Sequence, residues 1–404
     1  MKPVAAPSIR DSRPGLAIIS NEQTPYRLHL HRRIATELPE LRLWSLFTHE
    51  KASSPWKLTE CPEINPVWFG AGDSSQDQAK LSHAIKEWRK GGAILRWMQD
   101  RDIRAVVVLG YNDWGRWRIL QGCRRRGIPC LLFGDSNILC DNPSGAKALL
   151  KRALLPRILK RCSGVLYCGR LGREYFIRYG ADPARMFPFP YEPDYQAVQD
   201  VPLSQIEQAR RRYHLPAGRR YLIYSGRLTP VKRVDLLLHA FAAIAADRPH
   251  WDLIMAGDGE LRASLPSLVP ADLKPRVIWT GFIDDHQRLA ALYALADVLV
   301  LPSEYEPWGV VVTEAAVRLA LVASSVVGAA AEVLRDGVNG KLFENRSLPS
   351  LIAALREVTD ESRIDAFKAA SPKVLAEWRK RSDPVAGLRQ ALESVGALPV
   401  IPNR

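Results

Sequence analysis

The sequence has no apolar run long enough to cross a membrane, because its longest apolar stretches stay far below about 20 residues. No Sec-type leader is evident in the opening Met-Lys-Pro-Val-Ala-Ala, so we expect the chain to stay in the cytoplasm. Long low-complexity tracts and solenoid repeats are also missing. The 404 residues, 47% of them hydrophobic and 25% charged, therefore predict globular structure, and the length suits two domains.

Cysteine is scarce, and no two cysteines form a Cys-x-x-Cys pair. The six thiols all lie in the first half of the chain, at Cys61, Cys123, Cys130, Cys140, Cys162 and Cys168. This pattern argues against structural zinc and a disulfide framework and favours reduced, mostly structural thiols. The eight histidines are scattered, so the sequence predicts no metal site. Neither half shows a clear Gly-x-Gly-x-x-Gly after its first strand, which argues against a dehydrogenase.

Short apolar runs of strand length alternate with amphipathic stretches along most of the chain. The runs lie near Leu16, Leu43, Val106, Leu131, Val165, Leu222, Leu253, Val277, Val298 and Val322. Repeated alternation of strand and helix predicts parallel sheets covered by helices on both faces. Ligands of such sheets bind outside the carboxyl ends of the strands. The Pro-rich segment 187–195 is the expected domain boundary.

Two glutamates eight positions apart, Glu306 and Glu314, are the most informative feature of the sequence. The apolar residues 296–301 predict a buried strand, a Pro-Trp-Gly turn follows, and residues 310–319 predict a helix. Backbone N–H groups at a helix start favour phosphate or sugar oxygens. Ionised carboxylates accept hydrogen bonds from hydroxyl groups, so the pair could hold two parts of one ligand. The alternative is one glutamate that favours a helix start and a second that is merely solvated.

A second charged cluster follows the predicted strand 221–225. Gly226 and Arg227 form a turn, and Lys232 precedes an amphipathic helix. An arginine fork and a lysine point charge at a strand's carboxyl end match a diphosphate. The alternative is a surface ion pair with Asp235 or a neighbour.

Five motifs in a fixed order resemble the retaining glycosyltransferases of family four, among the glycosyl transferases of group 1. They are Gly226-Arg227-Leu with Lys232, Leu253-Ile-Met-Ala-Gly257-Asp-Gly259, Thr280-Gly281-Phe282, Ala296-Asp-Val-Leu-Val-Leu-Pro-Ser303 and the Glu306/Glu314 pair. The resemblance covers about residues 160 to 395. It implies an α/β GT-B fold, in which two Rossmann-like doubly wound domains face each other across a cleft.

The resemblance also implies how the chain is divided. Residues 1–195 would form the acceptor-binding domain, and residues 196–374 the nucleotide-sugar-binding domain. Residues 375–404 would carry a helix that crosses back to the first domain, with Ala376 to Leu392 as the candidate. The alternative is a helix that simply finishes the second domain.

The family's donor-site roles carry over to matching residues. Arg227, Lys232 and Glu306 are the implied catalytic residues: the two cations would neutralise the diphosphate, and Glu306 would hold the donor sugar. The implied donor contacts are Gly226, the Phe282 and Ile283 region against the base, the backbone of Trp308, Gly309 and Val310 at the sugar, and Glu314 at the ribose. Family members need no bound metal, and the cations with a helix start could do the ion's electrostatic work. We therefore expect no cofactor.

The acceptor side departs from the family pattern. The first domain lacks the glycine-rich loop and the His-Asp that the family often has, and Leu319 and Leu321 replace a usual Gly-x-Pro in the second. The acceptor candidates are Asn21, Thr24 and Arg27, after the strand 16–20, and Asp135, after the strand 130–133. Arg27 could bind a phosphate or sugar, and Asp135 could orient a hydroxyl. The alternatives are helix capping by Asn21 or Thr24 and an Asx turn at Asp135.

The formal net charge of +14 is unevenly spread. Residues 1–200 hold 31 Lys/Arg and 20 Asp/Glu, a net +11, whereas the remaining 26 Lys/Arg and 23 Asp/Glu give +3. The segment 114–178 alone has 14 basic and 3 acidic residues, again +11. Nucleic acid is a polyanion to consider, but no nucleic-acid-binding motif is present, so we expect no nucleic-acid partner.

The run Lys147–Arg161 could bind an anionic membrane surface. Leu150, Leu154 and Ile158 recur at i, i+4 and i+8, and the charged residues are all basic. Such a helix can lie on anionic lipid, with each cation contributing about 1 kcal/mol. Pro156 predicts a kink or two shorter helices. The alternative is a domain helix whose leucines face the sheet and whose cations are solvated.

These observations predict a retaining glycosyltransferase that moves a hexose-type sugar from a nucleoside diphosphate sugar to a hydroxyl. The expected acceptor is a lipid-linked or envelope glycan of polysaccharide biosynthesis, and the expected location is the cytoplasm, at the inner face of the membrane if the basic run binds lipid. Two alternatives stay open. One is a sugar-nucleotide epimerase or phosphorylase on the same fold, and the other is a non-catalytic nucleotide-sugar-binding protein.

Overall fold

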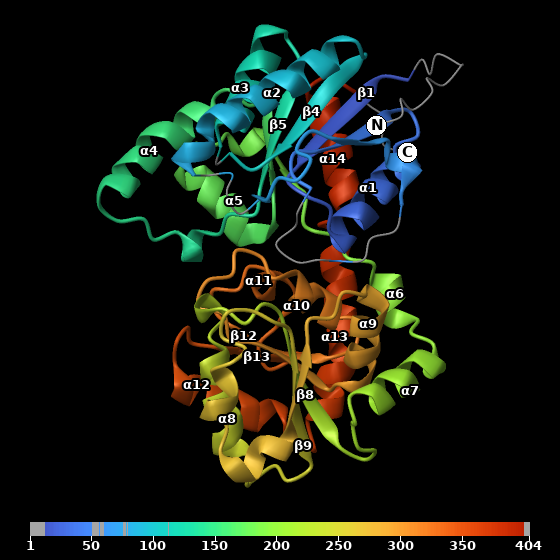
Figure 1. Ribbon diagram of the computed structural model, residues 1–404, viewed down its shortest axis with the longest axis vertical. Coiled ribbons are helices and arrows are strands. Elements are labelled where there is room, and N and C mark those ends of the chain that lie inside the picture. Colours follow the sequence, from blue (N-terminus) through green and yellow to red (C-terminus); the bar gives the residue numbers. More distant parts are fainter. Residues whose placement is uncertain are drawn as a thin grey trace.

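The computed structural model describes residues 13–50, 56, 60–75, 78, 80–111 and 113–399. Two parallel sheets form the centres of two lobes (Figure 1). The first has the strand order β3-β2-β1-β4-β5-β6-β7, and the second β10-β9-β8-β11-β12-β13. In each sheet the strand order reverses beside its first central strand, β1 or β8. Ligands of doubly wound sheets bind at this reversal, so each lobe presents one such site.

The first lobe contains seven strands and the helices that cover them. Its strands are β1 (Gly15–Ser20), β2 (Arg42–Phe47), β3 (Pro66–Trp68), β4 (Ile103–Leu109), β5 (Cys130–Gly134), β6 (Gly164–Tyr167) and β7 (Met186–Pro188). Its helices are α1 (Pro25–Glu37), α2 (Ala84–Gln99), α3 (Trp114–Arg125), α4 (Gly145–Leu159) and α5 (Gly169–Arg178). Strand and helix alternate because parallel neighbours need a crossover connection.

The second lobe follows α6 (Tyr195–Gln199) and α7 (Leu203–Arg212). Its strands are β8 (Arg220–Ser225), β9 (Trp251–Ala256), β10 (Val277–Gly281), β11 (Val298–Leu301), β12 (Ala320–Ser324) and β13 (Gly340–Phe343). Its helices are α8 (Val234–Ile244), α9 (His286–Leu295), α10 (Val310–Ala315), α11 (Ala330–Val333) and α12 (Leu348–Val358). The two sheets with their covering helices are the α/β fold that the sequence predicts.

The last two helices connect the lobes. α13 (Ile364–Arg379) packs against β12 and α11, and α14 (Pro384–Ser394) packs against β7 and α1 of the first lobe. Figure 1 shows this red segment running from the lower lobe to the upper. The return segment is therefore two helices, because Asp383 caps the start of α14 through the N–H groups of Val385 and Ala386.

Buried apolar strands form both cores. All six residues of β1 and of β9 are buried, as expected for strands covered by helices on both faces, whereas the edge strands β3 and β10 are partly exposed. In the first lobe, α1 and α14 cover one face of the sheet, and α2, α3, α4 and α5 cover the other. No helix of the described residues is both long and apolar enough to pass through a lipid bilayer.

Two predictions about helices are wrong. The helix predicted over 310–319 ends at Ala315, and a turn leads to β12. α4 is a single helix that includes Pro156, so this proline does not divide it into two shorter helices. Of the predicted stripe on α4, Leu150 and Leu154 are 59% and 44% exposed, whereas Ile158 is buried in the core of the first lobe together with Leu155 and Leu159.

Candidate active site

A pocket of about 560 Å³ opens at the carboxyl edge of the second sheet. Every residue predicted for the donor site except Trp308 lines it. These are Gly226, Arg227, Lys232, Phe282, Ile283, Glu306, Gly309, Val310 and Glu314. They follow β8, β10 and β11, and β8 and β11 flank the reversal of strand order. The fold thus brings together residues that lie up to 88 positions apart in the sequence, from Gly226 to Glu314.

Glycines shape this pocket by allowing close backbone approach. A Cβ atom on Gly257 would lie 1.8 Å from the carbonyl oxygen of Gly226, so the loops after β8 and β9 can touch only without a side chain there. Gly309 has φ = 91°, a left-handed conformation that favours glycine. It turns the chain from the β11 loop into α10. Because α10 has only six residues, the cationic side chains, rather than a helix dipole, dominate the charge of the pocket.

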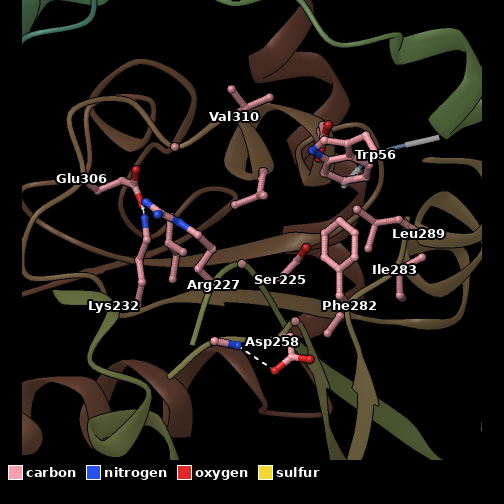
Figure 2. Close-up of a pocket in the computed structure, with 18 of the residues that line it drawn as sticks. Trp56, Ser225, Arg227, Lys232, Asp258, Phe282, Ile283, Leu289, Glu306 and Val310 are labelled. Carbon is pink, nitrogen blue, oxygen red and sulfur yellow. Dashed lines mark hydrogen bonds and ion pairs between the residues drawn. The ribbon is translucent and has the colours of Figure 1, made fainter. Parts of the chain in front are cut away.

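The charged side chains of the two predicted clusters meet in this pocket. Figure 2 shows Arg227, Lys232 and Glu306 side by side. Lys232 Nζ forms an ion pair with Glu306 Oε2, and Ser303 Oγ donates a hydrogen bond to the same oxygen over 3.3 Å. Arg227 is exposed and forms no ion pair with any residue that the structure describes. The pocket therefore holds one cation without a counter-charge.

The alternative ion pair with Asp235 does not involve either predicted cation. Asp235 pairs instead with Arg233, over 3.0 Å. Lys232 is held by Glu306 within the pocket, and Arg227 points into the same space. Both cations are thus available to a ligand of the pocket.

Glu314 has partners that the sequence did not reveal. His286 Nε2 lies 3.1 Å from Glu314 Oε1, and the Tyr293 hydroxyl donates to Oε2 over 3.3 Å. Burial lowers the pKa of His286, but the hydrogen bond and charge of Glu314 outweigh it, so the pKa is raised overall. Glu314 lines the pocket although it is only 5% exposed. His286 begins α9, and its position 28 residues before Glu314 gave no signal in the sequence.

Trp308 is turned away from the pocket. Its side chain is 2% exposed, and its ring lies 5.9 Å from that of Trp378 on α13. Its carbonyl oxygen accepts a hydrogen bond from Ala329 N over 2.8 Å. Trp308 therefore anchors the loop that carries Glu306 and Gly309, and the predicted contact of its backbone with the donor sugar stays a prediction.

An aromatic pair crosses the pocket from one lobe to the other. The rings of Trp56, from the first lobe, and Phe282 lie 5.3 Å apart in an edge arrangement (Figure 2). Ile283 is buried beside them. Flat apolar side chains suit a nucleobase, which has a π-face whatever its identity. The sequence predicted Phe282 and Ile283 here but not Trp56, because a single tryptophan in a polar stretch does not indicate a binding site.

A second, smaller pocket of about 170 Å³ lies at the carboxyl edge of the first sheet. Three of the four predicted acceptor residues, Asn21, Arg27 and Asp135, line it, and Thr24 does not. Thr24 takes the N-cap position of α1, but its side chain accepts no capping hydrogen bond. The expectation that Asn21 or Thr24 caps this helix by its side chain is therefore wrong.

Arg116 and Arg27 give the smaller pocket a basic wall. The Asn21 Oδ1 atom accepts a hydrogen bond from Arg116, which is also paired with the buried Asp113. Arg27 donates to the carbonyl oxygen of Glu22, while its Nε atom has no partner among the described residues. Arg116, which follows β4, was missed because it lies about 90 residues from Asn21 and Arg27.

Asp135 lines the smaller pocket, and a charged group of the larger pocket affects its pKa. Its Oδ2 atom accepts a hydrogen bond from the Tyr191 hydroxyl over 3.1 Å. Burial raises the pKa of Asp135, and the negative charge of Glu306 raises it further. Tyr191 lines the smaller pocket and Tyr26 the larger one, and their rings lie 4.9 Å apart. The two pockets therefore share one wall.

Asn137 links the two lobes at this point. Its Nδ2 atom donates to the carbonyl oxygens of Val326, over 2.9 Å, and Pro307, over 3.4 Å. Asn137 is 2% exposed and lies two residues after Asp135, whereas Pro307 follows Glu306 directly. One side chain thus ties the Asp135 loop to the Glu306 loop.

The structure also bears on the thiols and metals. All six cysteines are described and none forms a disulfide. Among the described residues, no three His, Cys, Asp or Glu side chains gather as a metal ion would require.

Comparisons with known proteins define the class of fold. The structure resembles that of Anabaena HepE in complex with UDP and glucose, with a TM-score of 0.69 and 16% identity, over 96% of this chain and 100% of that one. It also resembles a sucrose-phosphate synthase from Thermosynechococcus elongatus, with a TM-score of 0.73 and 17% identity, over 95% and 100%. Two facing Rossmann-like domains with this likeness are the GT-B fold.

The sequence comparisons define the family. Residues 205–373 match the family of glycosyl transferases group 1, and the chain thus carries a domain of that family, as the motifs predict. A D-inositol 3-phosphate glycosyltransferase of Thermobispora bispora is 33% identical over 180 residues, 42% of each chain. An alpha-D-kanosaminyltransferase of Streptomyces kanamyceticus is 28% identical over 191 residues, 47% of this chain and 46% of that one. The matched part is less than half the length of these two relatives.

Proposed function

We propose that this protein transfers a sugar from a nucleoside diphosphate sugar to a hydroxyl group, with retention of configuration at the anomeric carbon. One observation carries the proposal. A pocket with two cations, a carboxylate and an aromatic pair shares the Tyr26–Tyr191 wall with a polar pocket of the other lobe. A donor and an acceptor held in these two pockets would meet at that wall.

The donor would lie in the larger pocket. Its base would contact Phe282 and Trp56, and its ribose hydroxyls would reach Glu314. The diphosphate would lie against Arg227 and Lys232. Lys232 is paired with Glu306 in the structure, so we expect the diphosphate to compete for this lysine and leave Glu306 to accept hydrogen bonds from the sugar.

The reaction breaks the bond between the anomeric carbon and the phosphate oxygen. Negative charge then builds on the diphosphate, and Arg227 and Lys232 stabilise the leaving group because they are already in place. The acceptor oxygen attacks the same face of the sugar, and its proton passes to the departing phosphate. This scheme needs no separate protein base, and Asp135 would orient the acceptor hydroxyl through a hydrogen bond.

The proposal assigns no step to a metal ion or cofactor. Arg227 supplies positive charge without a counter-ion in the described structure, which is the electrostatic task that a divalent ion would otherwise perform. Turnover that persists in excess EDTA would support this assignment. Turnover that EDTA abolishes and Mg²⁺ restores would contradict it.

A panel of nucleoside diphosphate sugars tests the function. We expect one of them to raise the melting temperature of the protein, and the stabilising compound, with a hydroxyl acceptor, to yield a glycoside of retained configuration. Isomerised donor without an acceptor would instead indicate an epimerase. Sugar 1-phosphate formed from a glycan and phosphate would indicate a phosphorylase. Tight binding without turnover on any acceptor would indicate a binding protein.

A further inference from the structure

The helices α2 and α3 carry large apolar side chains on the outside of the first lobe. Ile85 and Trp88, on α2, are 70% and 37% exposed, and Trp114, the first residue of α3, is 50% exposed. Leu81, four positions before Ile85, is 80% exposed. Single exposed apolar residues are ordinary, but several on neighbouring helices form a patch that needs an explanation.

Cation–π contacts join these helices to α4. The Arg118 guanidinium of α3 lies 5.0 Å from the centre of the Trp88 ring and donates to the Trp88 carbonyl oxygen over 2.9 Å. Trp114 and Arg118 are four residues apart, so they share one side of α3. Arg161, just beyond α4, lies 4.9 Å from the centre of the Trp117 ring. These contacts link α2 to α3, and α3 to the end of α4.

On α4 and just beyond its end, two leucines and two arginines form a stripe. Leu150, Leu154, Arg157 and Arg161 recur at i, i+4, i+7 and i+11, which places them along one side of the helix. Both leucines are exposed, and Arg161 reaches the neighbouring Trp117. We call the surface formed by Ile85, Trp88, Trp114, Arg118, Leu150, Leu154 and Arg157 the helical face.

The helical face and the acceptor pocket lie toward the same edge of the first sheet. α3 and α4 follow β4 and β5, so both helices begin at the carboxyl edge of the sheet. α2 precedes the parallel strand β4 and starts at the same edge. Ile85, Trp88, Trp114 and Leu150 lie in the first half of their helices, and Leu154 lies just past the middle of α4. Asn21 and Asp135, which line the smaller pocket, follow strands that end at the same edge.

The helical face is positively charged because the carboxylates near it are paired with basic side chains or face the acceptor pocket. Of the three acidic residues in 114–178, Asp135 faces the acceptor pocket, Asp141 is paired with Lys151, and Glu174 is paired with Arg170. The acidic side chains at α2 and α3, Glu87 and Asp113, are 4% and 1% exposed and are themselves paired. The outward charges are those of arginine and lysine.

We propose that the helical face docks this protein on an anionic lipid bilayer. Protein surfaces that lie in the lipid headgroup region combine tryptophan and leucine with arginine. Positive charge adds attraction to anionic lipids. Docked in this way, the protein would present the smaller pocket to the bilayer surface, so a hydroxyl acceptor carried by a lipid could enter it.

Sedimentation with lipid vesicles tests the proposal on the full chain. We expect binding to vesicles of 30% phosphatidylglycerol in phosphatidylcholine, at least tenfold weaker binding to pure phosphatidylcholine, and a decline with added salt. The double variant Leu150→Ser/Leu154→Ser and the variant Trp114→Ser should each weaken binding at least tenfold. Arg157→Glu should weaken it by removing and reversing charge.

Matched controls lie on the other lobe. Leu203 on α7 is 81% exposed and Arg211 is exposed on the same helix, so Leu203→Ser and Arg211→Glu make the same changes outside the helical face. We expect them to bind vesicles as the wild type does, and all variants should keep its melting temperature within a few degrees.

Three results would overturn the proposal. They are equal loss of binding in the control variants, equal binding to neutral and anionic vesicles, and wild-type binding by Leu150→Ser/Leu154→Ser. Displacement of the protein from vesicles by single-stranded RNA at equal phosphate concentration, with RNA binding abolished by the same variants, would assign the helical face to nucleic acid instead. Donor-induced stabilisation is measured separately, so loss of docking and loss of catalysis are distinguishable.

Discussion

The donor pocket and the acceptor pocket are built in different ways. The donor pocket draws Arg227 and Lys232 from the segment after β8, Asp258 from the loop after β9, and Glu306 and Glu314 from the loop after β11 and from α10. The acceptor pocket draws on more elements: Asn21 follows β1, Arg27 lies on α1 and Arg116 on α3, and residues 109–111 and 133–136 lie at the ends of β4 and β5. A site made of contiguous motifs tolerates little change in any one loop, whereas a site made of scattered residues depends on how the whole sheet is assembled.

The donor side should be the more sensitive to loss of one charge. Arg227→Ala removes a cation that has no counter-charge in the described structure, and we expect kcat at saturating donor to fall by about 10²–10³-fold. Arg211→Ala, a matched exposed arginine on α7, should leave kcat unchanged. Steady-state kinetics on both variants provide the measurement. A kcat within a few-fold of wild type for Arg227→Ala would remove the diphosphate role.

On the acceptor side, Asp135→Asn should lower kcat by about 100-fold and leave donor binding intact. Burial, with the charge of Glu306, raises the pKa of Asp135 above its usual 3.8. If the ionised form orients the acceptor, wild-type kcat falls as the pH drops through this raised pKa, because the carboxylate becomes protonated. The asparagine variant should lack this acidic limb. A pH–rate profile with the same acidic limb in both proteins would exclude Asp135 as its source.

Asn137 tests whether the two pockets work independently. Asn137→Ala removes the hydrogen bonds to Pro307 and Val326, and we expect kcat/KM for the acceptor to fall by about tenfold, from the loss of a buried hydrogen bond. Asn137→Asp should be worse, because a carboxylate would face two carbonyl oxygens. Donor affinity, measured by calorimetry, should change little.

The control for this link is a buried asparagine that stays within one lobe. Asn339 donates to the carbonyl oxygen of Val333 over 2.9 Å, so Asn339→Ala should lower the melting temperature without a matching loss of kcat/KM. If both alanine variants lose activity only in proportion to stability, Asn137 is merely structural.

The smallest effect concerns His286 and the stability of the donor lobe. Its pKa is raised by Glu314 despite burial, so the charged form stabilises the folded state. This contribution is complete below the unfolded value of about 6.5 and is lost as the pH rises through the raised folded pKa. Between pH 6 and pH 9 the melting temperature of the wild type should therefore drop by a few degrees more than that of His286→Gln. Parallel curves in differential scanning fluorimetry would exclude the link.

The comparison also explains how far sequence reasoning could reach. It placed Arg227, Lys232, Glu306 and Glu314 in one site because each follows a strand of recognisable pattern, and parallel strands end at a common edge. It could not place Trp56, His286 or Arg116, whose neighbours in space come from distant segments. It also predicted a donor contact with the backbone of Trp308, whose ring packs on Trp378 and whose carbonyl oxygen accepts a hydrogen bond from Ala329 N.

The sequence by itself determined the alternation of strands and helices, the group 1 motifs and the excess of positive charge, because these depend on local pattern and composition. The tertiary structure alone decided which partners each charged group meets. Lys232 with Glu306, Glu314 with His286, and Asn137 with Pro307 are contacts between separate loops. Such contacts depend on how the sheets and lobes pack, and local sequence carries no record of that packing.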